Sequence, residues 1–162
     1  MSKIKYVKGD ATAPKGKDNR LIIHCCNDIG GWGSGFVLAI SKRWKAPEQE
    51  YRNWHTRKRN AKFLLGNIQI VPVAENLAVA NMIGQRGIWN HVKDDEPPIR
   101  YWAIQDALKK VYHYCNDNNV SVHAPKFGAD RAGGDWPTIE NLINIELVDK
   151  GIDVTIYEYV PK

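Results

Sequence analysis

His24, Cys25 and Cys26 have the clearest chemical potential in this sequence, because they lie together in a short apolar run that begins at Leu21. In an extended strand, His24 and Cys26 share one face and Cys25 takes the other. A thiol beside an imidazole is the arrangement of a cysteine nucleophile. The alternative, which we favour, is a hydrogen-bonded core histidine with two small buried thiols.

A glycine-rich loop at residues 30–35 follows the cysteines and precedes an apolar run that starts at Phe36. The loop is no P-loop, because the chain has no G-x-x-x-x-G-K-[ST] motif, and Phe36 stands where a dinucleotide fingerprint needs its third glycine. Ser34 is no elbow nucleophile, because Trp32 replaces the first glycine of G-x-S-x-G. Backbone N–H groups at a helix N-terminus bind phosphate oxygens without a charged side chain. The loop therefore predicts a pyrophosphate site; the alternative is an ordinary surface loop.

A second glycine-rich loop lies at residues 128–134 and contains Asp130 and Arg131, with Asp135 directly after it. A carboxylate and a guanidinium at this place could face the phosphate site of the first loop. The alternative is that these side chains serve turns and surface ion pairs.

Three tryptophans, Trp32, Trp89 and Trp136, lie in or beside glycine-rich segments. An indole ring in such a loop can cover a nucleotide base or ribose. A purely structural use is the alternative for each ring.

The elements that must position these loops alternate between short apolar strands and helices. Strands are predicted at residues 3–8, 21–26, 68–73, 77–83, 120–123 and 154–159, and helices from residue 36 and at 47–60, 101–118 and 138–150. The pair 68–73 and 77–83 predicts a hairpin, and Thr138 is the expected N-cap of the last helix. The alternation predicts an α/β fold that binds its ligand at the carboxyl ends of the strands.

Composition sets the broad class of protein. The chain has 162 residues, 43% of them hydrophobic and 25% charged, with a mean hydropathy of -0.47, which predicts one globular domain over residues 1–162. It has no apolar run long enough for a membrane span and no apolar segment of a secretory signal near its N-terminus, so we expect a cytoplasmic protein without membrane contact. Three cysteines, two of them adjacent, predict reduced thiols.

The net charge of +5 points to an anionic partner. Eight lysines and arginines lie within residues 42–62, against only Glu48 and Glu50. That segment could meet nucleic acid, but the whole-domain charge is modest for a dedicated binder, so we favour a solvated basic helix and expect no nucleic-acid partner.

Four ordered motifs resemble the macro domain family over nearly the whole chain. They are Tyr-Val-Lys-Gly-Asp at 6–10, His-Cys-Cys-Asn at 24–27, Gly-Trp-Gly-Ser-Gly at 31–35 and Pro-Lys-Phe-Gly-Ala-Asp-Arg-Ala-Gly-Gly-Asp-Trp at 125–136. Within that family, the sequence is most similar to the ADP-ribose 1''-phosphate phosphatases. The resemblance implies a three-layer αβα macro domain with a mixed central sheet.

The resemblance also implies the ligand, a small-molecule ADP-ribose derivative, and its contacts. Asp10, with Ala11 beside it, would accept from the adenine amino group, Tyr159 would border the adenine, and Asn27 would approach the distal ribose. The remaining contacts implied for the ligand are Gly9, Cys26, Trp32, Gly33, Ser34, Gly35, Phe36, Phe127, Gly128, Ala129, Arg131, Ala132, Gly133 and Gly134.

The activity implied by the resemblance is release of phosphate from ADP-ribose 1''-phosphate by a monomer that needs no metal or cofactor. His24 would transfer a proton or attack phosphorus, and Asp130 would orient water or the histidine. Two alternatives stay open: a binding module without turnover, and a hydrolase that removes ADP-ribose from modified proteins. Gln85 stands where a related subgroup has a lysine, which counts against one route to that hydrolysis.

Overall fold

The computed structural model describes residues 3–57, 62–88, 96–129 and 132–159. Three residues that the sequence singled out, Trp89, Asp130 and Arg131, lie outside these ranges. Nothing in the structure therefore bears on the roles predicted for them.

A six-stranded mixed sheet forms the centre of the molecule. Its strands are β1 (Lys5–Lys8), β2 (Arg20–Asn27), β3 (Ile68–Ala74), β4 (Leu77–Gln85), β5 (Ser121–Ala124) and β6 (Val154–Glu158). The order across the sheet is β1-β6-β5-β2-β4-β3, and all neighbours are parallel except β3 and β4. The predicted hairpin is thus confirmed as the antiparallel pair at one edge.

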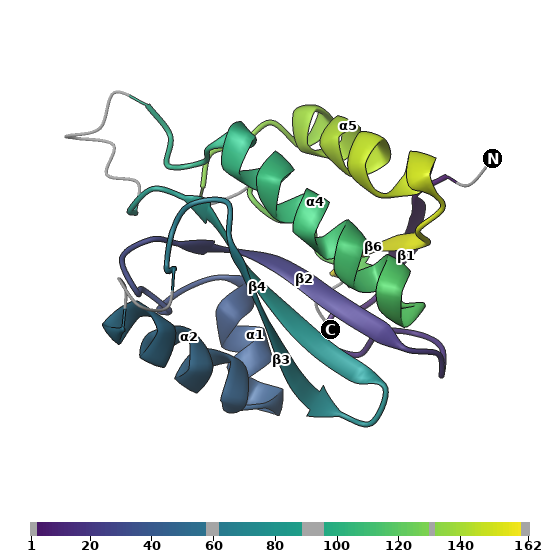
Figure 1. Ribbon diagram of the computed structural model, residues 1–162, viewed down its shortest axis with the longest axis horizontal. Helices are drawn as coiled ribbons and strands as arrows, with labels where there is room; N and C mark the ends of the chain where they lie inside the picture. Colours follow the sequence, from purple (N-terminus) through teal and green to yellow (C-terminus); the bar gives the residue numbers. More distant parts are fainter. Residues whose placement is uncertain (1–2, 58–61, 89–95, 130–131, 160–162) are drawn as a thin grey trace.

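Helices cover both faces of the sheet. They are α1 (Phe36–Arg43), α2 (Ala46–Thr56), α4 (Tyr101–Asn118) and α5 (Trp136–Glu146), followed by the short 3-10 helix η1 (Val148–Lys150). Figure 1 shows α1 and α2 on one face and α4 and α5 on the other, which confirms the three-layer αβα architecture. Within the described ranges, no helix is both long enough and apolar enough to cross a membrane.

Strand β2 connects the two halves of the core. Leu21 and Ile23 point into the cluster that contains the α4 and α5 side chains, whereas Ile22 and Cys26 point into the cluster beneath α1 and α2. All four side chains are buried. A continuous apolar run is expected for a central parallel strand with both faces covered, and β2 matches that expectation.

The start of α5 differs from the prediction. The helix begins at Trp136, and its N-cap is Asp135, whose carboxylate accepts a hydrogen bond of 3.1 Å from the backbone N–H of Thr138. Thr138 was therefore wrongly expected to be the cap. A carboxylate is a strong N-cap and Pro137 suits the first turn, so the chain becomes helical two residues earlier.

The second of the predicted helices is shorter than expected. It ends at Thr56, and Arg57 follows as a turn with a φ of -88° and a ψ of 2°. Periodicity marks the middle of a helix better than its last turn, because terminal carbonyl groups can bond to other partners.

Candidate functional site

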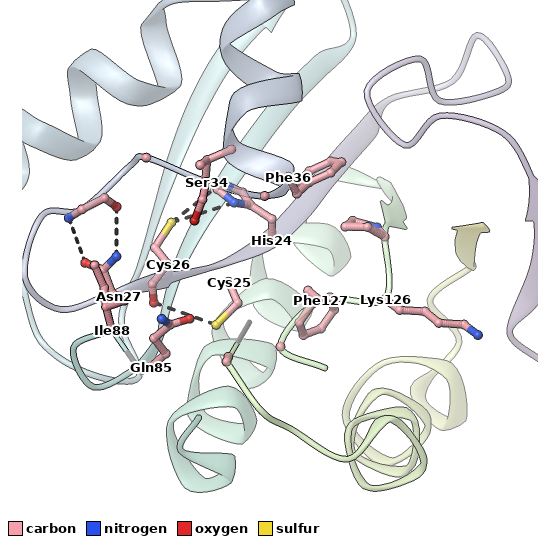
Figure 2. A pocket seen from close by; sticks show the side chains of 17 residues that line it. His24, Cys25, Cys26, Asn27, Ser34, Phe36, Gln85, Ile88, Lys126 and Phe127 are labelled. Atoms are coloured by element: carbon pink, nitrogen blue, oxygen red, sulfur yellow. Dashed lines mark hydrogen bonds between the residues drawn. The ribbon is translucent and has the colours of Figure 1, made fainter. Parts of the chain in front are cut away.

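A cavity of 710 Å³ lies where β2, β4 and β5 end, between the two predicted glycine loops. Figure 2 shows the side chains around it. The structure brings many of the sequence-predicted site residues to its wall: His24, Cys26, Asn27, Gly33, Ser34, Gly35, Phe36, Phe127, Gly128 and Ala132. Carboxyl ends of parallel strands are where ligands bind in α/β sheets.

Other predicted contacts lie outside the wall of this cavity. These are Gly9, Asp10, Ala11, Trp32, Ala129, Gly133, Gly134 and Tyr159. The structure adds wall residues that the motifs did not single out as contacts, among them Gln85 at the end of β4, Ile88 beyond it, and Lys126 after β5. A strand that ends in a polar residue, as β4 does in Gln85, is the sequence signal that could have identified that position.

The N-terminus of α1 lies at the cavity and has hydrogen-bond donors without a partner among the described residues. The backbone N–H groups of Ser34, Gly35, Phe36 and Val37 donate to no described residue, and no side chain caps the helix. All four residues line the cavity. Free N–H groups at a helix N-terminus carry partial positive charge, so this end of the cavity favours a phosphate oxygen.

Asn27 holds the first glycine loop in place. Its side-chain oxygen accepts hydrogen bonds from the backbone N–H groups of Ile29 (3.1 Å) and Gly31 (2.9 Å), and its amide nitrogen donates to the Gly31 carbonyl at 3.0 Å. The buried Tyr51 hydroxyl lies 2.5 Å from the backbone carbonyl oxygen of Asn27 and 2.9 Å from the same side-chain oxygen, so its single proton is donated to Asn27. The carboxamide of Asn27 is therefore a structural brace for the loop, and its predicted contact with a ribose stays a prediction.

His24 lies against the cavity but is almost completely enclosed, with 1% of the residue exposed. Its Nε2 lies 2.6 Å from the side-chain oxygen of Asn81, and the rings of Trp32 and Phe36 pack beside it. Burial lowers the pKa of His24 to about 4, although the hydrogen bond to Asn81 opposes that shift. The imidazole is therefore neutral at pH 7.

The two cysteines are not activated nucleophiles. Burial raises the pKa of Cys25 to about 12 and holds the pKa of Cys26 well above its usual value. The sulfur of Cys26 is 3.9 Å from both ring nitrogens of His24, too far for proton transfer to a neutral imidazole in this state. Both side chains are thiols at pH 7, as expected for small buried residues.

Charge is scarce around the cavity. Among the wall residues that the structure describes, Lys126 is the one with a basic or acidic side chain other than His24. Its Nζ lies 3.5 Å from the Glu158 carboxylate, and Figure 2 shows it directed away from His24. In the described part of the chain, no group of three or more His, Cys, Asp or Glu residues is placed to hold a metal ion. An anion in this cavity would depend mainly on backbone N–H groups and the α1 dipole.

Asp10, predicted to meet the adenine, is held by its neighbours. One carboxylate oxygen accepts from the Thr12 N–H and hydroxyl at 2.8 and 2.7 Å, and the other lies 3.4 Å from the Arg43 guanidinium. Burial alone would raise its pKa, but the hydrogen bonds from Thr12 and Arg43 outweigh burial and lower it. Asp10 is thus an ionised acceptor with a fixed orientation.

Trp32 and Tyr159 have opposite environments. Trp32 is 4% exposed, and its indole N–H donates to Ser41 at 2.7 Å, so the ring belongs to the core beneath α1 and α2. Tyr159, directly after β6, is 72% exposed and available to a ligand. Its predicted place beside an adenine stays a prediction.

The fold of this chain is similar to the folds of several solved structures. No family model matches the chain. The structure is similar to that of a protein of unknown function from Bacteroides thetaiotaomicron, with 49% identity, a TM-score of 0.93 and coverage of 98% of this chain and 99% of that one. It is also similar to a macrodomain protein from Streptomyces coelicolor, with 46% identity, a TM-score of 0.86 and coverage of 98% and 100%.

Two relatives by sequence have informative names. The chromodomain-helicase-DNA-binding protein 1-like of Danio rerio is 30% identical over 165 residues, and this chain, matched over 96% of its length, spans only 16% of that protein. The ADP-ribose 1''-phosphate phosphatase of Candida albicans is 26% identical over 148 residues, which are 86% of this chain and 91% of that protein. Because the Streptomyces macrodomain protein is 46% identical and covered along its whole length, the chain belongs to the macro domain family, close to the ADP-ribose 1''-phosphate phosphatases.

Proposed function

We propose that this chain binds ADP-ribose 1''-phosphate in the cavity and hydrolyses it to ADP-ribose and inorganic phosphate. The observation that carries the proposal is the set of unused N–H groups at the start of α1, whose residues line the same cavity as a neutral histidine. The N–H groups would bind the phosphate oxygens, and the histidine would accept a proton. The name of the Candida albicans relative supports the choice of substrate.

His24 would act as the proton acceptor. Its Nε2 bonds to Asn81, which leaves Nδ1 for the reaction. A water oxygen forms a bond to phosphorus while the bond from phosphorus to the ribose O1'' breaks; Nδ1 takes one water proton and passes it to O1''. An anionic phosphate beside the ring favours the imidazolium form, so substrate binding would raise the pKa of His24 from its low value in the empty cavity. Asp130 remains our proposed residue for orienting the water.

A second candidate is an ADP-ribose-binding module without turnover. The observation in its favour is the enclosure of His24, which is 1% exposed and contacts no carboxylate among the described residues. Catalytic histidines usually have a partner that stabilises the imidazolium ion, and Asn81 carries no charge to do so. The same cavity would serve both candidates, so turnover is the property that separates them.

The test is a phosphorus NMR time course with ADP-ribose 1''-phosphate and no added metal. We compare the wild type with His24→Gln, in which the new side-chain amide can still donate to Asn81 but has no basic nitrogen. The matched control is His123→Gln, because His123 is also a buried histidine on a neighbouring strand and does not line the cavity. The proposal predicts a rate loss of roughly 100-fold or more for His24→Gln alone.

The outcomes of this time course are distinct. Phosphate and ADP-ribose that appear in step in the wild type and the control, but not in His24→Gln, support the phosphatase. Substrate signals that broaden without conversion support the binding module instead. Signals that neither broaden nor convert contradict both candidates.

A further inference from the structure

Asn81 is the single strongly polar residue in the apolar run of β4, and the motifs of the sequence give it no role. It is completely buried, it does not line the cavity, and it lies directly opposite His24 in the parallel pair of β2 and β4. A buried carboxamide at the centre of a sheet is costly unless its donors and acceptor are used. The hydrogen bonds that Asn81 makes determine which ring nitrogen of His24 carries the proton.

The orientation of the Asn81 carboxamide follows from its partners. Its amide nitrogen is 3.1 Å from the carbonyl oxygen of Pro47 and 3.0 Å from the side-chain oxygen of Gln69. A backbone carbonyl can only accept, so the atom that faces Pro47 must be the amide nitrogen. Gln69 is oriented in the same way, because its own amide nitrogen donates to the Glu50 carbonyl at 2.9 Å.

With both N–H groups of Asn81 committed, the atom that faces His24 is an oxygen. An amide oxygen only accepts, so the Nε2 of His24, at 2.6 Å, must carry the proton. In a neutral imidazole the other nitrogen, Nδ1, is then unprotonated. The other hydrogen-bond and ring contacts of His24 among the described residues are with the Cys26 thiol and the rings of Trp32 and Phe36, none of which is charged.

We infer that Asn81 is a positioning residue, which fixes His24 in the tautomer with the proton on Nε2 and so makes Nδ1 the basic atom. The chain of hydrogen bonds from Glu50 through Gln69 and Asn81 ties that tautomer to α2 and β3, elements that do not touch the cavity. The importance of this tautomer for turnover rests on the proposed function, because the reaction needs a ring nitrogen with a free electron pair. The tautomer itself does not depend on any ligand.

The first experiment measures the tautomer directly in the intact wild-type protein. Long-range proton–nitrogen NMR distinguishes a protonated from an unprotonated ring nitrogen, and His24→Gln identifies the signals of this residue. The inference predicts a protonated Nε2 and an unprotonated Nδ1 at pH 7. A proton on Nδ1, or a mixture of both tautomers, overturns the inference whether or not the protein turns over any substrate.

The second experiment removes the Asn81 carboxamide. Asn81→Ala takes away the acceptor of the Nε2 proton, so both tautomers become populated and kcat for ADP-ribose 1''-phosphate falls by roughly tenfold with little change in KM. Gln69→Leu is the milder variant for the case that Asn81→Ala does not fold, since Gln69 is only partly buried on the edge strand β3 and its loss removes one of the two constraints on the carboxamide.

A purely structural role for Asn81 would lower stability without moving the tautomer signals, and that result would overturn the inference. A wild type with the predicted tautomer but no turnover would contradict the proposed phosphatase and leave the assignment of the tautomer intact. Loss of turnover in a folded Gln69→Leu protein with wild-type tautomer signals would also count against the inference.

Discussion

Replacing Gly33 with alanine should separate ligand binding from folding. Gly33 lines the cavity, its φ is outside the positive range, and a Cβ built on it meets no heavy atom within 4 Å. The empty protein therefore has room for a methyl group at this position. A bound diphosphate that approached the loop backbone would not leave that room.

The expected magnitudes have opposite signs for stability and for binding. Alanine in place of Gly33 lowers the entropy of the unfolded chain, so the free energy of unfolding should stay the same or rise by about 0.4–1 kcal/mol. A methyl group that displaces phosphate from one backbone N–H removes one charge-assisted hydrogen bond, about 1.5–3 kcal/mol. That loss corresponds to a roughly 10- to 150-fold weaker Kd for ADP-ribose.

Calorimetric titration with ADP-ribose and thermal unfolding without ligand measure the two effects. Gly151→Ala is the matched control, because a Cβ at Gly151 also meets open space and Gly151 is not part of the cavity wall. Gly151 differs from Gly33 in its backbone, since its φ is +91° at the end of η1. The control should lose about 1 kcal/mol of stability and keep its affinity. An unchanged affinity in Gly33→Ala would refute the argument that the backbone of this loop holds the phosphates.

Three further predictions concern stability and loop order. Asp135→Ala removes the N-cap of α5 and should cost about 1 kcal/mol in urea unfolding. Tyr51→Phe removes the buried hydroxyl that donates to Asn27, so it should cost about 1–2 kcal/mol in the same assay and weaken ADP-ribose binding through the loop; unchanged binding would contradict the bracing role of Asn27. Burial lowers the pKa of His24 from 6.5 to about 4, so the unfolded chain binds more protons between those values, and this histidine alone should lower the free energy of unfolding by roughly 3 kcal/mol as the pH drops through that window. Burial lowers the pKa of His123 to about 4 as well, so His24→Gln and His123→Gln should each have a shallower pH profile than the wild type; a wild-type slope in His24→Gln would contradict the low pKa of His24.

The general architecture could be predicted from the spacing of apolar residues and from the positions of the glycine-rich loops. The continuous apolar run in β2 predicted a strand covered on both faces, and the structure packs Ile22 and Ile23 into separate core clusters on the two sides. The glycines predicted strand-to-helix loops, and both loops meet at one cavity. These signals are local and repeat along the chain, so a single sequence is enough to detect them.

The state of each site residue depended on tertiary contacts that periodicity does not encode. The sequence placed His24 beside the first loop, but its neutral state comes from burial, and its hydrogen-bond partner Asn81 is 57 positions away in the chain. Asn27 is expected to approach the ribose, and its hydrogen bonds to its own loop are a second role that the sequence did not predict. Trp32 was a candidate to cover a base and is a core residue, because Ser41 satisfies its indole N–H away from the cavity.

The most direct test of the account is a map of backbone amide shifts as ADP-ribose is added to the isotope-labelled protein. We expect the largest shifts at residues 34–37, where the N–H groups are unused, and a second group of shifts at the loop that starts at Gly128. Shifts confined to the segment at residues 42–62, which is rich in lysine and arginine, or absent at saturating ligand, would contradict the claim that the cavity between the two glycine loops is the ADP-ribose site.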